Sequence, residues 1–235
     1  MLVQGYAFYL SEPTDTSEFD ALLPFVSIHR QELINRLRYQ NDKIRSLVGD
    51  ALTRLAIIKE IGLQNRDINF HYLKDQKPTL VHNASFHFSV SHSGNWIICC
   101  TDSQPIGVDI EKIQRTDLSS LSSRIYNNQE QATALTLSPS RQLAYFYERW
   151  TLKESLLKST GFGLRYPLNQ LQIESDDPNH AVLSSHFQNQ RYFFVPYTLD
   201  KAYQLAICTL KQPFNDVFRI VSLKELHHTL ACYSS

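Results

Sequence analysis

The sequence predicts an α+β fold of two similar halves, each combining a long helix with antiparallel strands. Apolar residues recur at three- and four-residue steps over residues 42–61, which is typical of a helix. A second long helix is predicted from a capping signal at residue 138, and hairpin patterns follow both helices. The strings NWIICC and YQLAIC, one in each half, are alike. We therefore predict two halves, residues 1–105 and 106–235, related by pseudo-two-fold symmetry.

The first half begins with a predicted strand over residues 2–10, where apolar residues alternate imperfectly with polar ones. The helix that follows ends at Gly62, because glycine is the commonest residue after a helix C-terminus. Residues 85–101 alternate and then become continuously apolar, with turn residues at 92–95 between, which predicts a hairpin. A third strand is expected over residues 106–110.

The second half repeats this order. Ser138 is the predicted N-cap of a helix over residues 139–159, with a proline at its first position and Gly161 beyond its end. Residues 193–198 and 203–210 then form a second predicted hairpin.

Composition excludes several classes of protein. Of the 235 residues, 43% are hydrophobic and 20% are charged, which indicates a folded chain. Lys+Arg and Asp+Glu both number 23, so the formal charge is zero and non-specific nucleic-acid binding is not favoured. No stretch approaches the ~18 apolar residues of a membrane span, and the first residues do not resemble a secretory signal. The four cysteines show no C-x-x-C spacing, so we expect buried reduced thiols and a cytoplasmic location.

The first motif with chemical meaning is GVDIE at residues 107–111. Alternation along a strand puts Asp109 and Glu111 on one face, about 7 Å apart. Mg²⁺ prefers oxygen ligands and commonly takes one or two carboxylates together with phosphate oxygens. Alone, however, such a pair is more typical of a solvated strand face.

Two further motifs are each ambiguous by themselves. Trp150, Glu154 and Lys158 are spaced four apart and share a helix face, yet an exposed Glu–Lys pair of this spacing is common. In the segment SHSG, residues 91–94, a histidine could donate to a phosphate, although a polar turn explains the same residues. No G-x-S-x-G motif supports a serine hydrolase.

Together, and in this order, the three motifs resemble the signature of 4′-phosphopantetheinyl transferases. The resemblance is to the longer, monomeric, two-half form that activates surfactin synthetase, and it covers nearly the whole chain. It implies that family's fold and the transfer of the phosphopantetheine arm of coenzyme A to a serine of an apo acyl or peptidyl carrier protein. Adenosine 3′,5′-bisphosphate would be released. Such carriers serve fatty-acid, polyketide and non-ribosomal peptide biosynthesis.

The resemblance also implies roles for individual charged residues in the second half. Asp109, Glu111 and Glu154 would hold Mg²⁺ against the pyrophosphate, which makes Glu154 essential to catalysis. Lys158 would contact coenzyme A and offset the charge that develops on the leaving group. Glu130 would take the proton of the carrier serine, although a solvated loop glutamate is the alternative.

The resemblance further implies a set of coenzyme A contacts. These are Arg30, Arg45, Ser46, Lys77, Ser91 and His92. Ser91, His92 and Arg30 match positions at the 3′-phosphate, and the other three match positions around the adenosine. Two residues depart from the family pattern: Leu33 replaces a second basic residue, and Gln76 replaces a glycine.

Residues 162–164 match the stretch that relatives use to dock the carrier, with Arg165 suited to an acidic carrier helix. Two other functions stay open from the sequence. One is a different Mg²⁺-dependent enzyme that cleaves a nucleotide pyrophosphate, and the other is a catalytically silent protein that binds coenzyme A.

Overall fold

The structure is a computed structural model, and its chain divides into two compact units. Unit 1 comprises residues 1–72, 78–103 and 215–235, and unit 2 comprises residues 73–77 and 104–214. The residues that the structure describes are 3–11, 16–72, 77–163, 166–175, 183–211 and 218–234. Each unit has its own hydrophobic core.

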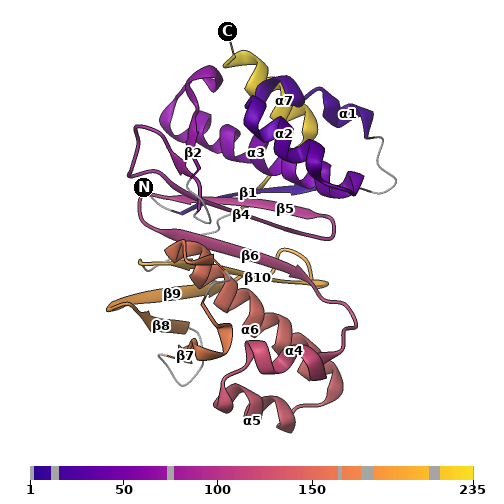
Figure 1. The fold of residues 1–235 in the computed structure, drawn as a ribbon, viewed down its shortest axis with the longest axis vertical. Coiled ribbons are helices and arrows are strands. Elements are labelled where there is room, and N and C mark those ends of the chain that lie inside the picture. The colour runs from indigo at the N-terminus through magenta and orange to yellow at the C-terminus, as the bar shows by residue number, and fades with distance from the viewer. Residues whose placement is uncertain are drawn as a thin grey trace. The chain divides into compact units, whose positions relative to one another are not determined.

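Unit 1 is a four-stranded sheet covered by helices on one face (Figure 1). The strand order is β11 (Phe218–Ile220), β1 (Gln4–Tyr9), β5 (Trp96–Asp102) and β4 (His87–Ser93). A small hairpin is formed by β2 (Phe70–His71) and β3 (Thr79–Leu80). The helices are α1 (Ser17–Asp20), α2 (Ile28–Arg36), α3 (Gln40–Ile61) and α7 (Leu223–Cys232), with short 3₁₀ turns at Leu23–Phe25 and Asn65–Asp67.

The long helix α3 confirms the prediction for residues 42–61. It packs across β5 and β4, and Gly49 lets it approach the sheet closely, since a Cβ there would lie 3.1 Å from Val90 Cγ1. The helix ends as predicted at Gly62, whose φ of 71° is left-handed and therefore suits a residue without a Cβ.

Unit 2 is a five-stranded antiparallel sheet with a second long helix across it. Its strand order is β6 (Ile106–Lys112), β10 (Tyr203–Thr209), β9 (Gln190–Pro196), β8 (Leu183–Phe187) and β7 (Glu174–Ser175). The helices are α4 (Leu118–Ile125), α5 (Asn128–Thr136) and α6 (Pro139–Thr160), followed by a 3₁₀ turn at Leu168–Gln170. Helix α6 packs on β6 and β10, and α4 and α5 pack on α6 (Figure 1).

The two units share one internal topology, which confirms the predicted α+β class with a repeated helix and antiparallel strands. In each, a first strand is followed by a long helix and a hairpin, and the last hairpin strand pairs antiparallel with the first strand. Even the register agrees, because Cys100 pairs with Gly5 and Cys208 pairs with Gly107. The predicted symmetry relation between the halves stays a prediction.

The end of the chain differs from the predicted boundaries. Residues 215–235 belong to unit 1 rather than to a second half of 106–235, although the division at 103–104 lies close to the predicted one. Strand β11 pairs in parallel with β1, and α7 packs on α3. The physical reason is burial: Leu226 and Leu230 of α7 are fully buried in the core of unit 1.

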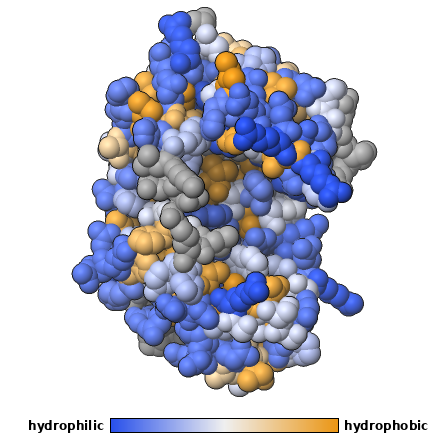
Figure 2. Space-filling model, viewed as in Figure 1, coloured by the Kyte–Doolittle hydropathy of each residue, from blue (hydrophilic) through white to orange (hydrophobic). Residues whose placement is uncertain are grey.

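The predictions about the cysteines and about membrane-spanning segments can also be compared with the structure. Cys99, Cys100 and Cys208 are buried free thiols as expected, but Cys232 is exposed, so the expectation was wrong there. Among the helices that the structure describes, none combines the length and apolar character needed to span a bilayer. On the face seen in Figure 2, apolar residues are interspersed with hydrophilic ones, and single exposed apolar residues are normal in folded proteins.

Candidate active site

The candidate site in unit 2 is built where β6 lies directly against α6. Gly107 makes this approach possible, because a Cβ there would lie 1.8 Å from the backbone oxygen of Ser155. Because residues two apart on a strand share a face, the Asp109 side chain lies on the face of β6 that contacts α6, as Gly107 does. The absence of a side chain at Gly107 therefore allows Asp109 to lie close to the C-terminal half of α6.

Asp109 forms an ion pair with Lys158 of α6. Lys158 Nζ donates to Asp109 Oδ1 at 2.6 Å. The Asp109 side chain is almost completely buried, whereas 30% of the Lys158 side chain is exposed. The lysine can therefore reach solvent while its carboxylate partner stays fixed beneath it.

Glu154 is a buried carboxyl group one helical turn before Lys158. Among the residues that the structure describes, Glu154 Oε1 has no hydrogen-bond partner. The pKa of Glu154 is raised to about 7, mainly by burial and next by the negative charge of Asp109; Glu111 adds to the rise and the ammonium group of Lys158 opposes it. Glu111 is half-buried near the end of β6. The charges of Asp109 and Glu111 thus oppose ionisation of Glu154, whereas the ammonium group of Lys158 favours it.

This arrangement is not a preformed metal centre. Within the described part of the chain, no group of three or more His, Cys, Asp or Glu side chains has the geometry of a metal site. The assignment of Asp109, Glu111 and Glu154 as Mg²⁺ ligands therefore stays a prediction.

Glu130 lies in a different environment from the solvated loop considered above. It is 5% exposed and occupies the third position of α5, where it forms a capping box with Asn127. Glu130 Oε2 accepts from the backbone N–H of Asn127 at 2.9 Å and from Lys153 Nζ at 2.5 Å. Lys153 is fully buried and also donates to the carbonyl of Ile125 at 2.7 Å. Burial lowers the pKa of Lys153, and the charge of Glu130 opposes this.

Two predicted coenzyme A residues of unit 1 lie at the same end of its sheet. Arg45, on the second turn of α3, donates from Nε to the carbonyl of Gly94 in the β4–β5 turn at 2.9 Å. His92 is exposed on β4, two residues before that turn. Val90 packs against α3, so alternation puts His92 on the helix side of the sheet and Ser91, which is buried, on the other side.

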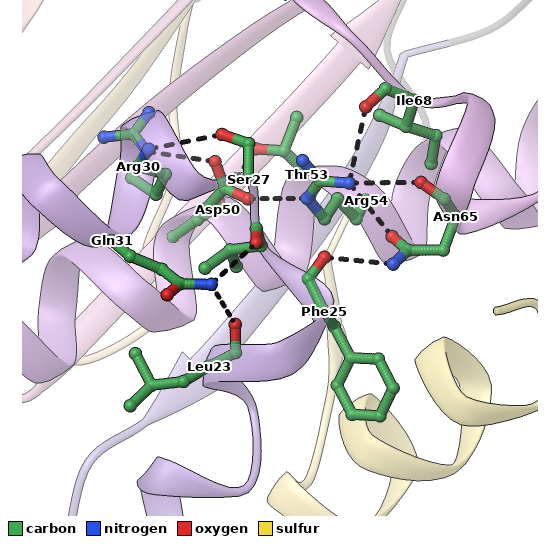
Figure 3. Close-up of polar contacts among 12 residues, drawn as sticks. Leu23, Phe25, Ser27, Arg30, Gln31, Asp50, Thr53, Arg54, Asn65 and Ile68 are labelled. Atoms are coloured by element: carbon green, nitrogen blue, oxygen red, sulfur yellow. Dashed lines mark hydrogen bonds and ion pairs between the residues drawn. The ribbon is translucent and has the colours of Figure 1, made fainter.

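Ser46 is half-buried on α3, next to Arg45 in the chain. Arg30 of α2 is held by a buried carboxylate, since its Nε donates to Asp50 Oδ2 at 3.0 Å. Figure 3 shows Asp50 lying between Arg30 and a second arginine, Arg54. Arg30 is therefore not an ordinary surface arginine.

Lys77 belongs to unit 2, where its Nζ donates to the carbonyl of Ile106 at the start of β6, at 2.6 Å. In the predicted docking stretch, Phe162 is 37% exposed and its ring contacts that of Phe187. Gly163 follows with a left-handed φ of 59°. Leu164 and Arg165, together with Gln76, lie outside the described residues.

Sequence reasoning missed Lys153, Asp50 and Arg54 as organising residues. The only available signal was the i, i+4 spacing of Asp50 and Arg54, which is equally typical of an exposed helix pair. Lys153 directly precedes Glu154 in the helix segment of residues 150–158, but nothing in its local sequence indicates complete burial.

Comparison with known proteins decides the family. The N-terminal family model for 4′-phosphopantetheinyl transferases matches residues 12–104, and the model of the 4′-phosphopantetheinyl transferase superfamily matches residues 105–208. A 4′-phosphopantetheinyl transferase from Bacillus subtilis is 33% identical over 94% of this chain and 98% of its own length. The chain belongs to the 4′-phosphopantetheinyl transferase family. The transferase Sfp from Bacillus subtilis strain 168 is 31% identical over the same shares of the two chains.

These full-length matches confirm the predicted resemblance to transferases of the surfactin-synthetase-activating type. The protein is thus an enzyme, a 4′-phosphopantetheinyl transferase. A solved structure of a holo-(acyl-carrier-protein) synthase from Bacillus anthracis in complex with CoA also matches, at 22% identity and a TM-score of 0.40. It covers 46% of this chain and 96% of its own, and the family assignment does not depend on it.

Proposed function

We propose that this transferase moves the 4′-phosphopantetheine arm of coenzyme A to a serine of an apo acyl or peptidyl carrier protein in a Mg²⁺-dependent reaction. The hydroxyl oxygen of the serine forms a bond to the phosphorus that carries the pantetheine arm. The bond from that phosphorus to the bridging oxygen breaks, and adenosine 3′,5′-bisphosphate leaves. The observation that carries the proposal is the acidic cluster of buried Asp109 and Glu154 with half-buried Glu111, in which Lys158 pairs with Asp109.

The chemistry of the acidic residues suits a hard divalent cation, although their side chains would have to move closer together to share one. The members of the cluster supply carboxylate oxygens, and Glu154 Oε1 is buried without a hydrogen-bond partner among the described residues. Asp109 and Glu111 both raise the pKa of Glu154, so one ammonium group leaves the negative charge of the cluster only partly neutralised. Mg²⁺ held by these three residues would supply positive charge beside the pyrophosphate of coenzyme A.

Lys158 is the residue that we propose to stabilise the leaving group. Its side chain is 30% exposed, and its ammonium group donates to the buried carboxylate of Asp109. Donation to the departing phosphate would offset charge that grows in the transition state, so its loss should lower kcat more than substrate affinity.

Glu130 is the proposed acceptor of the serine proton. Its Oε2 is already engaged by Lys153 and by the backbone of Asn127. Oε1 has no hydrogen-bond partner among the described residues, and it is the atom that would receive the proton. This group must come within hydrogen-bond reach of the serine in the complex with the carrier.

We further propose that Arg30, Arg45, Ser46, Lys77, Ser91, His92 and Lys158 contact coenzyme A. Arg45 and His92 support this most directly, because a guanidinium and an exposed imidazole at one end of a sheet can both donate to phosphate oxygens. Phe162 and Gly163 are the described part of the proposed carrier-docking stretch. The enzyme would act as a monomer in the cytoplasm, and sedimentation with and without carrier tests the first point.

The decisive experiment is incubation with coenzyme A, Mg²⁺ and a panel of apo carrier proteins, followed by intact mass measurement. We expect a carrier to gain the mass of one phosphopantetheine, and a serine-to-alanine carrier to gain nothing. Cleavage of coenzyme A that proceeds equally well without any carrier would instead identify a pyrophosphate-cleaving enzyme.

The metal assignment has a test that does not depend on activity. Mg²⁺ should raise the thermal midpoint of the wild type, because a bound cation relieves repulsion among the carboxylates. Glu154→Gln should abolish most of this rise, whereas Glu148→Gln, on the same helix but 37% exposed at the side chain, should keep it. An equal rise in all three proteins would remove Glu154 from the metal site.

A further inference from the structure

A buried polar network in unit 1 surrounds Asp50 of α3 (Figure 3). Asp50 is 5% exposed, and each of its carboxylate oxygens accepts from a different arginine. Arg54 Nε donates to Oδ1 at 2.7 Å, and Arg30 Nε donates to Oδ2 at 3.0 Å. One carboxylate therefore joins an arginine of the core to an arginine of the surface.

The inner side of the network is firmly anchored. Arg54 is 3% exposed, and its Nη1 donates to the side-chain oxygen of Asn65 at 3.1 Å. The Asn65 amide in turn donates to the carbonyl of Phe25 at 2.9 Å and to Ser234 Oγ at 3.3 Å. Because these contacts come from three separate segments of unit 1, the Asp50 carboxylate has little freedom to turn.

The outer side of the network presents Arg30. Its side chain is 23% exposed, against 2% for Asp50. The guanidinium lies over the ring of Tyr72, 5.9 Å from the centroid, and only its Nε donates to Asp50. Among the described residues, Nη1 of Arg30 donates to none. The arginine is thus braced on two sides with donors to spare, and two arginines share one carboxylate, so the network as a whole keeps a positive charge.

We propose that Asp50 is a positioning residue for recognition of the 3′-phosphate of coenzyme A, acting through Arg30. This rests on the proposed role of Arg30 as a contact of that phosphate. The ion pair with Asp50 already neutralises the buried charge of Arg54, yet the second carboxylate oxygen, Oδ2, accepts from Arg30. A guanidinium binds phosphate through a planar set of donors, so fixing its plane in advance reduces the ordering cost of binding. Arg54 and Asn65 hold the carboxylate that fixes this plane.

The test compares coenzyme A with 3′-dephospho-coenzyme A as substrates of the full-length enzyme. The measured quantity is the ratio of the two kcat/KM values, which isolates recognition of the 3′-phosphate. Arg30→Ala should reduce this ratio about tenfold or more, as expected for loss of a charge-assisted hydrogen bond. Asp50→Asn should reduce it about fivefold, within the range for coupled residues of one ion-pair network. The same Asp50→Asn change should have no effect on the ratio in an Arg30→Ala background.

Two further variants keep the result interpretable. Thr53→Val removes a buried hydroxyl from the same helix, one that donates to the carbonyl of Gly49 rather than to the network, and should leave the ratio unchanged. Arg30→Lys keeps the charge but has no Nε for Asp50 to hold, so it should lose most of the discrimination even if Asp50→Asn fails to fold.

The outcomes separate the two levels of inference. If Arg30→Ala leaves the ratio intact, the phosphate contact and the role of Asp50 are both wrong, although phosphopantetheinyl transfer itself is untouched. If Arg30→Ala lowers the ratio but Asp50→Asn does not, or if Arg30→Lys discriminates like the wild type, only the positioning role is overturned.

Discussion

Replacing Lys153 by methionine tests whether the buried ion pair with Glu130 organises unit 2. Lys153 is 0% exposed and bridges the carboxylate of Glu130 and the carbonyl of Ile125, at 2.5 and 2.7 Å. Methionine fills a similar volume but leaves Glu130, which is 5% exposed, as a buried carboxylate without its counterion. Removing one partner of a buried pair typically costs about 3–5 kcal/mol. We expect that loss for Lys153→Met, and a similar one for Glu130→Gln.

The double variant supplies the decisive comparison. When both charges are removed, no uncompensated charge stays buried, so Lys153→Met with Glu130→Gln should cost about 2 kcal/mol or less. The coupling energy between the two sites should therefore be several kcal/mol, larger than for distant sites, which usually add within about 0.5 kcal/mol.

Urea unfolding followed by tryptophan fluorescence measures these values. The two tryptophans are Trp96 in β5 and Trp150 in α6, so a Trp96→Phe background makes the signal report on α6 alone. Single-variant losses below about 1 kcal/mol, or a double variant as unstable as the sum of the singles, would refute the buried-pair reasoning. The double variant also separates stability from catalysis: if Glu130 is the proton acceptor, kcat should fall about a hundredfold or more although the fold is retained.

Two further predictions concern the packing of the long helices and the partly buried carboxyl group of Glu60. Gly107→Ala should destabilise unit 2 by about 3 kcal/mol or more, because the new Cβ would lie 1.8 Å from a backbone oxygen of α6. Gly49→Ala should be nearly neutral in the same urea assay, because its Cβ would meet only side-chain methyl groups, of Val90 at 3.1 Å and Ile97 at 3.8 Å. Equal effects of the two substitutions would contradict the close-approach argument. Burial raises the pKa of Glu60 above the ordinary 4.5, so the folded state binds more protons and its stability should fall as pH rises from 4.5 through the raised pKa. Glu60→Gln should lose this dependence, so its stability relative to the wild type should increase over that pH range. A stability difference that does not change with pH would refute this reasoning.

Much of each unit is determined locally, and the sequence alone predicted it. The apolar periodicity of α3, the glycines at 62 and 161 beyond the long helices, and the two hairpins all follow from steric and burial rules that act over a few residues. The helix at residue 138 begins where predicted, although the Ser138 side chain makes no capping hydrogen bond in the structure. The strand period also put Asp109 and Glu111 on one face, while the resemblance to the family added Glu154; their role as Mg²⁺ ligands stays a prediction.

Only the tertiary structure decided the rest, because it depends on contacts between residues far apart in the chain. Strand β11 joins β1 at the opposite end of the sequence, which no local pattern indicates. Lys153 and Asp50 look like surface charges in the sequence and are buried in the structure. A charge can be buried only where distant segments provide its counterion and hydrogen bonds, as Glu130 does for one and the two arginines do for the other.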